Sequence, residues 1–165
     1  MITPDRTLQW PSHFPPRNRW KQFFIGVRWL GPDLSFFKNL RELQEKRRAE
    51  ALSAWLEGEQ RDVAFVMGKA FQTELGWPTP YFLPADNFHV IAYGPRFQSI
   101  DDLGFSSAAA KIERQLQRQF PKTFWKQCVH QNMLFGSVIV DVLALPHAAN
   151  TSKSRWKFWL WGRKE

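Results

Sequence analysis

The chain has 165 residues, of which 44% are hydrophobic and 16% aromatic, and a formal net charge of +8. This length and apolar content predict a globular unit with its own core and exclude wholesale disorder. A single cysteine, Cys128, excludes an internal disulfide and a zinc site built on several thiolates, which is typical of a reducing compartment. We therefore expect a cytoplasmic protein, and no apolar run resembles a signal peptide or a membrane-spanning helix.

The positive charge is concentrated at the two ends of the chain. Residues 1–30 and residues 153–165 each hold five basic residues and one acidic residue, whereas residues 31–152 hold 13 of each kind. Six of the nine tryptophans lie in the same two end segments. A surface that binds nucleic acid broadly would carry basic residues across the whole fold. The distribution therefore favours an acidic or anionic partner that the ends contact.

The first part of the chain predicts an extended arm followed by a strand. Residues 1–19 contain four prolines, each of which fixes φ and removes a backbone donor. The stretch 20–30, WKQFFIGVRWL, is apolar and contains enough β-forming residues to predict a first strand.

Two helices are predicted next. Apolar residues recur at helical spacing from Phe36 to Trp55 until Gly58 interrupts them, and the same spacing runs over residues 59–75 until Gly76. We expect the two helices to pack as an antiparallel pair, because the connection between them is short.

The pattern changes between residues 76 and 104. Three prolines in residues 76–87 predict a long aromatic loop, since proline fits neither a regular helix nor a central strand. Residues 88–93, FHVIAY, alternate well enough to predict a strand, and residues 94–104 predict a second loop of similar length.

The following residues predict two more helices and a central strand. Apolar positions in residues 107–120 fall on one helical face, and Pro121 opens a shorter helix that runs to Asn132. Residues 134–145, LFGSVIVDVLAL, form a nearly continuous apolar run that is rich in β-branched side chains. Such a run is typical of a strand buried on both faces.

These elements together predict an α+β or mixed α/β domain, with a small sheet of about three strands and about four helices. We expect a single globular domain over residues 20–146, preceded by the extended, proline-rich arm 1–19. Residues 147–165 are expected to form a polar linker and a basic, tryptophan-rich tail.

The sequence contains no recognisable catalytic, metal or nucleotide motif. The histidines never lie four residues apart, and HExxH, CxxC, GxGxxG, GxxxxGK[ST] and GxSxG patterns are all missing. Asp101 and Asp102 are the best acidic pair, and we expect them to cap the following helix and complement its dipole. We expect neither a metal nor a cofactor, and we favour a protein without catalysis of its own.

A groove beside the predicted strand 88–93 is one candidate site. Long loops flank this strand on both sides, and such loops are where binding residues concentrate. The candidate lining residues are Trp77, Tyr81, Phe82, His89, Tyr93, Asp101 and Asp102. The alternative is that these aromatic residues pack at the edge of the sheet and that the prolines only stiffen it.

The tail 153–165, KSRWKFWLWGRKE, is the other candidate site. Rings beside basic residues are typical of a segment on an anionic membrane, where each basic residue contributes about 1 kcal/mol. The candidate binding residues are Arg155, Trp156, Lys157, Phe158, Trp159, Trp161, Arg163 and Lys164. The alternative is that the tail folds back and that Trp156, Phe158 and Leu160 complete an edge of the sheet.

The sequence thus favours a non-enzymatic interaction module whose cationic, tryptophan-rich termini contact an anionic membrane surface or an acidic protein. Two alternatives stay open. One is a nucleic-acid-binding protein in which arginines meet phosphates and rings stack on unpaired bases. The other is an enzyme whose site is assembled around His89 and Asp101 or Asp102. We expect a cytoplasmic location, with membrane association at the periphery only.

Overall fold

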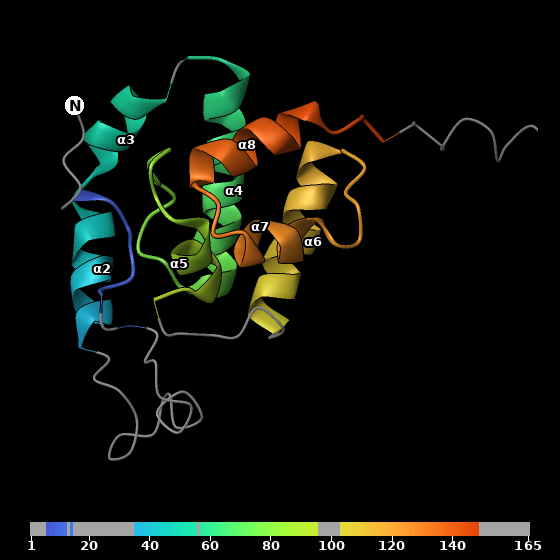
Figure 1. The fold of residues 1–165 in the computed structure, drawn as a ribbon. Coiled ribbons are helices and arrows are strands. Elements are labelled where there is room, and N and C mark those ends of the chain that lie inside the picture. The colour runs from blue at the N-terminus through green and yellow to red at the C-terminus, as the bar shows by residue number, and fades with distance from the viewer. Residues whose placement is uncertain (1–5, 13, 15–34, 56, 96–102, 149–165) are drawn as a thin grey trace, which may run out of the picture.

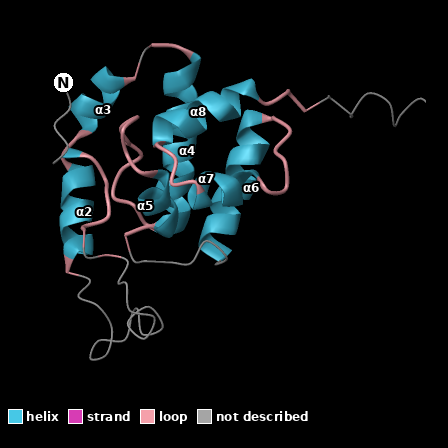
Figure 2. Cartoon of the chain, viewed as in Figure 1, coloured by secondary structure: helices cyan, strands magenta, loops and turns pink. Residues whose placement is uncertain are grey.

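The fold is helical. The computed structural model describes residues 6–12, 14, 35–55, 57–95 and 103–148, and seven α-helices make up most of this part of the chain (Figures 1 and 2). Over those residues the only β-type pairings are two isolated bridges. The predicted α+β fold with a small sheet is therefore wrong. The predicted strand 20–30 lies outside the described residues.

Two short helices stand where one long helix was predicted. They are α2 (Phe36–Glu45) and α3 (Arg48–Ala54), and the chain leaves helical geometry at Arg47, whose φ is −107° and ψ 23°. The side chain of Arg47 is turned inward and only 3% of the residue is exposed. The break places this basic side chain inside the molecule.

The central helix, α4 (Glu59–Leu75), has the bounds that the sequence predicts. Gly76 ends it in the left-handed conformation with φ +80°, which glycine adopts at little cost. The helix packs most extensively against α6 (Leu103–Leu116) and also contacts α5 (Phe88–Tyr93) and α8 (Phe135–Ala144). In Figure 1, α4 lies between α2 and α3 on one side and α6 on the other. Pairing with the preceding helices is therefore not the main packing of α4.

The predicted strand 88–93 is a helix, α5 (Phe88–Tyr93). The Asn87 side chain caps its start by accepting a hydrogen bond from the N–H of His89 at 2.9 Å. Phe88, Val90, Ile91 and Ala92 are all fully buried. A short apolar run buried on several sides has no visible period, so alternation did not distinguish this helix from a strand.

The predicted central strand is also a helix, α8 (Phe135–Ala144). Its fully buried residues are Phe135, Val138, Ile139 and Val142, which follow the helical spacing i, i+3, i+4 and i+7. Val140 is exposed although it is apolar, and this blurred the helical pattern. The β-branched content of the run reflects core packing in this protein and does not indicate a strand.

The two remaining helices confirm the predicted helical segments, with shifted bounds. α6 (Leu103–Leu116) begins and ends four residues before the predicted range, and α7 (Phe124–His130) is shorter than predicted. Residues 76–87 form a loop, as predicted, and it lies against the core. Pro80 of this loop approaches Gly68 of α4 so closely that a Cβ atom there would lie 2.0 Å from the Pro80 carbonyl oxygen.

Aromatic rings fill the centre of the molecule. The largest fully buried rings are those of Trp77, Phe71, Phe82, Phe88 and Phe135. The Trp77 indole donates to the carbonyl of Ile91 at 3.0 Å, so its polar atom is satisfied inside the core. No helix in the described part of the chain is both long and apolar enough to cross a bilayer.

Candidate functional site

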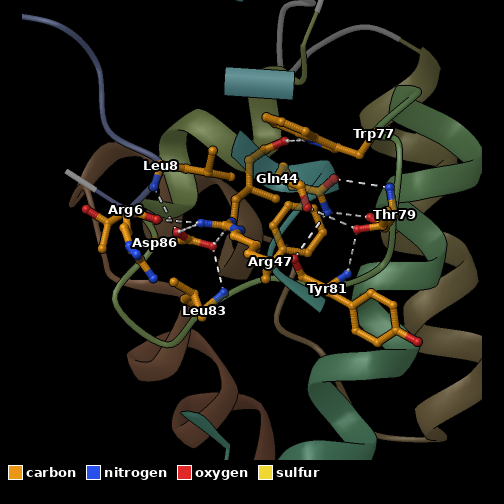
Figure 3. Close-up of polar contacts among 12 residues, drawn as sticks. Arg6, Leu8, Gln44, Arg47, Trp77, Thr79, Tyr81, Leu83 and Asp86 are labelled. Carbon is orange, nitrogen blue, oxygen red and sulfur yellow. Dashed lines mark hydrogen bonds and ion pairs between the residues drawn. The ribbon is translucent and has the colours of Figure 1, made fainter. Parts of the chain in front are cut away.

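A buried ion pair joins three parts of the chain that are distant in sequence. Asp86 is fully buried, and its carboxylate accepts hydrogen bonds from both terminal nitrogens of Arg47. Nη1 donates to Oδ1 at 2.9 Å, and Nη2 donates to Oδ2. The backbone N–H groups of Leu8 and Leu83 donate to the same carboxylate at 2.8 and 2.7 Å (Figure 3). Burial raises the pKa of Asp86, and the guanidinium and the two N–H groups oppose that rise.

Residues 6–10 lie across this ion pair, with a turn at residues 6 and 7. The N–H of Asn87 donates to the carbonyl of Leu8 at 2.9 Å, and Nη1 of Arg47 donates to the carbonyl of Arg6 at 3.0 Å. The side chain of Leu8 is fully buried in the core. We call residues 6–10 the docked segment, and the surface that receives it the docking site, made by Arg47, Leu83, Asp86, Asn87 and His89.

His89 holds the far end of the docked segment. The Trp10 indole donates to Nδ1 of His89 at 2.7 Å, and the His89 ring stacks on Tyr93 with centroids 4.5 Å apart. Burial lowers the pKa of His89, and the nearby His130 lowers it further. His89 is therefore neutral at pH 7, and the lone pair on its Nδ1 accepts the indole N–H of Trp10.

The candidate groove residues that the structure describes fall into three environments. His89 and Tyr93 lie together beside the docked segment, on one face of α5. Trp77 and Phe82 are buried in the core with ring centroids 5.6 Å apart. Tyr81 is half-buried elsewhere, against Phe65 and the guanidinium of Arg48, which lies 5.4 Å from its ring centroid. Asp101 and Asp102 lie outside the described residues.

The candidate tail residues, from Arg155 to Lys164, also lie outside the described residues. The structure does fix where the chain approaches them. The N–H of Gln119 donates to the carbonyl of Pro146 at 2.8 Å, and the N–H of Ala148 donates to the carbonyl of Gln117 at 2.7 Å. Residues 146–148 are thereby held against the end of α6.

Cys128 is not a nucleophile at neutral pH. The residue is buried, and burial together with the negative charge of Asp141 raises the pKa of its thiol to about 12. Within the described ranges, no three histidine, cysteine or acidic residues gather closely enough to hold a metal ion.

The docking site was missed at the level of sequence, although two signals for it are present. Arg47 falls on the apolar stripe of the predicted helix, where a basic residue needs a buried partner. Asp86 directly precedes the capping residue Asn87 after a proline-rich loop. Neither signal identifies the other residue, because the pair forms across 39 positions of the chain.

Comparisons with known proteins find no relative for this arrangement: no family model, no curated protein and no solved structure matches the chain significantly.

Proposed function

We propose that this chain is a non-enzymatic interaction module whose cationic, tryptophan-rich end segments bind an anionic partner, either a membrane surface or an acidic protein. The observation that carries the proposal is the charge distribution. Residues 1–30 and 153–165 each have a net charge of +4, and residues 31–152 are neutral overall. Positively charged ends are attracted to a negatively charged surface. Each basic residue near an anionic membrane contributes about 1 kcal/mol to the binding free energy.

The packing of the helical body limits how far from it the C-terminal basic segment can begin. The described helices form a core in which a set of rings contact one another, including Phe71, Phe82, Phe88 and Phe135. The chain is then held at Ala148, five positions before Lys153. An extended chain spans about 3.4 Å per residue. The basic segment therefore begins within about 17 Å of the body, close enough for both to contact one partner.

The body also contributes positive charge near this point. Residues 103–148 contain five basic residues and two acidic residues. Arg114, Lys122 and Lys126 are exposed and make no ion pair with the described residues. Lys122 follows the same 117–119 stretch that holds residues 146–148. Arg114 lies three positions before this stretch and Lys122 three positions after it, so both add positive charge close in sequence to the residues that hold positions 146–148.

The test is co-sedimentation of the full chain with vesicles of phosphatidylserine and phosphatidylcholine, compared with phosphatidylcholine alone. We expect binding to the anionic vesicles that weakens as salt screens the charges. Replacing Lys153, Arg155, Lys157, Arg163 and Lys164 by glutamine should abolish it. The matched variant Trp156→Ser/Trp159→Ser/Trp161→Ser keeps the charge and should weaken binding through lost ring burial alone.

The other partner classes are separated in the same assay. Binding to polyglutamate with no binding to anionic vesicles would assign an acidic protein as the partner. A preference for a single-stranded oligonucleotide over both would instead favour the nucleic-acid alternative. The proposal fails when the glutamine variant binds every anionic probe as the unmodified chain does.

A further inference from the structure

The docked segment is held largely through its backbone. Leu8 donates its N–H to Asp86 and accepts from the N–H of Asn87, and the Arg6 carbonyl accepts from Arg47. These three hydrogen bonds use atoms that every peptide carries. Proteins that bind extended peptides use such main-chain bonds for affinity and reserve specificity for a few side-chain pockets.

Two side chains of the docked segment make specific contacts. Leu8 is fully buried, and Trp10 donates its indole N–H to His89 while its ring lies edge-on to Tyr93. The residue between them, Gln9, is exposed. Thr7 is buried as well, so the buried side chains of the segment do not alternate with exposed ones along its whole length.

The docking site is held together by contacts that do not involve the segment. Asp86 accepts from the guanidinium of Arg47 and from the N–H of Leu83, and Leu8 takes no part in these two contacts. Asn87 caps α5 and donates its side-chain N–H to Asn132 at 2.8 Å. These contacts join residues of the helices and of the loop before α5. The site is therefore largely preformed.

The docked segment is linked to the helices by a long stretch of chain. Between Phe14 and Ser35 lie twenty residues, which would span about 70 Å when extended. This length is enough for the segment to leave its site while it stays covalently attached.

We propose that the docking site is a binding site for peptides in which a leucine is followed two residues later by a tryptophan, and that residues 6–10 are its tethered occupant. A partner peptide of this kind competes with the chain's own segment. The inference uses neither the tail nor net charge, although the docked segment lies within residues 1–30, one of the two cationic end segments.

The test uses a fluorescein-labelled peptide of residues 6–14, RTLQWPSHF, and measures its anisotropy with the full chain. The variant Leu8→Asp/Trp10→Ala removes the two side-chain anchors of the tethered segment and frees the site. We expect it to bind the probe at least tenfold more tightly than the unmodified chain. The same probe carrying aspartate in place of its leucine should not bind. Adding His89→Phe, which removes the indole acceptor, should weaken probe binding severalfold.

A folded Leu8→Asp/Trp10→Ala chain that does not bind the probe overturns the proposal. When that variant fails to unfold cooperatively, a second measurement decides. A protease site is introduced between residues 15 and 34, the folded chain is cleaved, and excess probe is added. Release of the native segment and uptake of the probe support the site, whereas retention without exchange, or loss of the segment without uptake, contradicts it.

Discussion

Trp10 donates its indole N–H to Nδ1 of His89, 79 positions away in sequence, at 2.7 Å. The bond requires a neutral imidazole, because a protonated Nδ1 carries a hydrogen of its own and accepts nothing. Attachment of the docked segment is therefore linked to the protonation of one histidine.

This linkage predicts a loss of stability on acidification. Burial holds the pKa of His89 in the folded chain below its ordinary value of 6.5, so the unfolded chain binds the proton more readily. The stabilisation is complete above pH 6.5 and is lost as the pH falls through the lower, folded-state pKa. Urea unfolding at a series of pH values measures the effect.

His89→Asn is the matched control for this titration. Its amide oxygen can accept the Trp10 indole in place of Nδ1, and the amide does not titrate. The difference in the free energy of unfolding between the two chains should grow as the pH falls below 6.5. A difference that is constant with pH would contradict the assignment to His89.

The buried ion pair predicts a large cost for removing one partner. Asp86→Ala leaves the guanidinium of Arg47 buried and uncompensated and removes the acceptor of two backbone N–H groups. Breaking such a pair costs about 3–5 kcal/mol. Urea denaturation should show this loss, and the double variant Arg47→Met/Asp86→Leu should recover part of it, since no buried charge remains.

An exposed ion pair provides the comparison. Lys38 and Glu42 lie 3.8 Å apart on the surface of α2. Exposed pairs of this kind contribute about 0–1 kcal/mol, so Lys38→Met should change the free energy of unfolding by no more than that. Equal effects of Asp86→Ala and Lys38→Met would contradict the structural role of Asp86.

The position of Gly68 in α4 predicts that a glycine-to-alanine change there destabilises the fold. Alanine in a helix interior normally stabilises by about 0.5–1 kcal/mol relative to glycine. At Gly68, however, a Cβ would lie 2.0 Å from the backbone oxygen of Pro80. Overpacking typically costs about 1–3 kcal/mol, so Gly68→Ala should lower the unfolding midpoint. Gly136→Ala, whose Cβ would meet Pro84 at 3.0 Å, should lower it less.

The thiol of Cys128 should react only after the chain unfolds. Its pKa of about 12 leaves almost no thiolate at pH 8, and the side chain is buried. Iodoacetamide labelling followed by mass spectrometry should therefore be slow in buffer and should rise along the urea unfolding curve. Rapid labelling of the folded chain would show that the thiol is exposed or activated.

The sequence predicted α4 from its marked ends and its length. α4 carries glycines at both ends and an exposed acidic first turn, so its period and its ends are visible. α5 is buried on most sides, and α8 carries an apolar residue, Val140, on its exposed face, so the β-branched content of both segments indicated strands. Tertiary burial overrode local propensity in both segments. Two signals in the sequence do indicate helices here: the capping residue Asn87 before α5 and the i, i+3, i+4 spacing of apolar residues in α8.

The docking site could be predicted only in part, because its residues lie far apart in the sequence. His89 and Tyr93 were placed on one face of a predicted strand, whereas the structure brings them together as i and i+4 on a helix. Trp10 and Leu8 were assigned to an extended, proline-rich arm. Their partners lie more than 70 positions away, and one sequence gives no measure of such distant contacts.

The way residues 146–148 are held also determines how a mechanical load on the tail would travel. A partner that retains residues 153–165 pulls first on two backbone hydrogen bonds, those that join Gln117 and Gln119 to the departing chain. Arg118, between them, donates to the carbonyls of Leu143 and Leu145 and to Glu59 at the start of α4. Tension therefore passes to α6 and the first turn of the central helix, as well as to the end of α8.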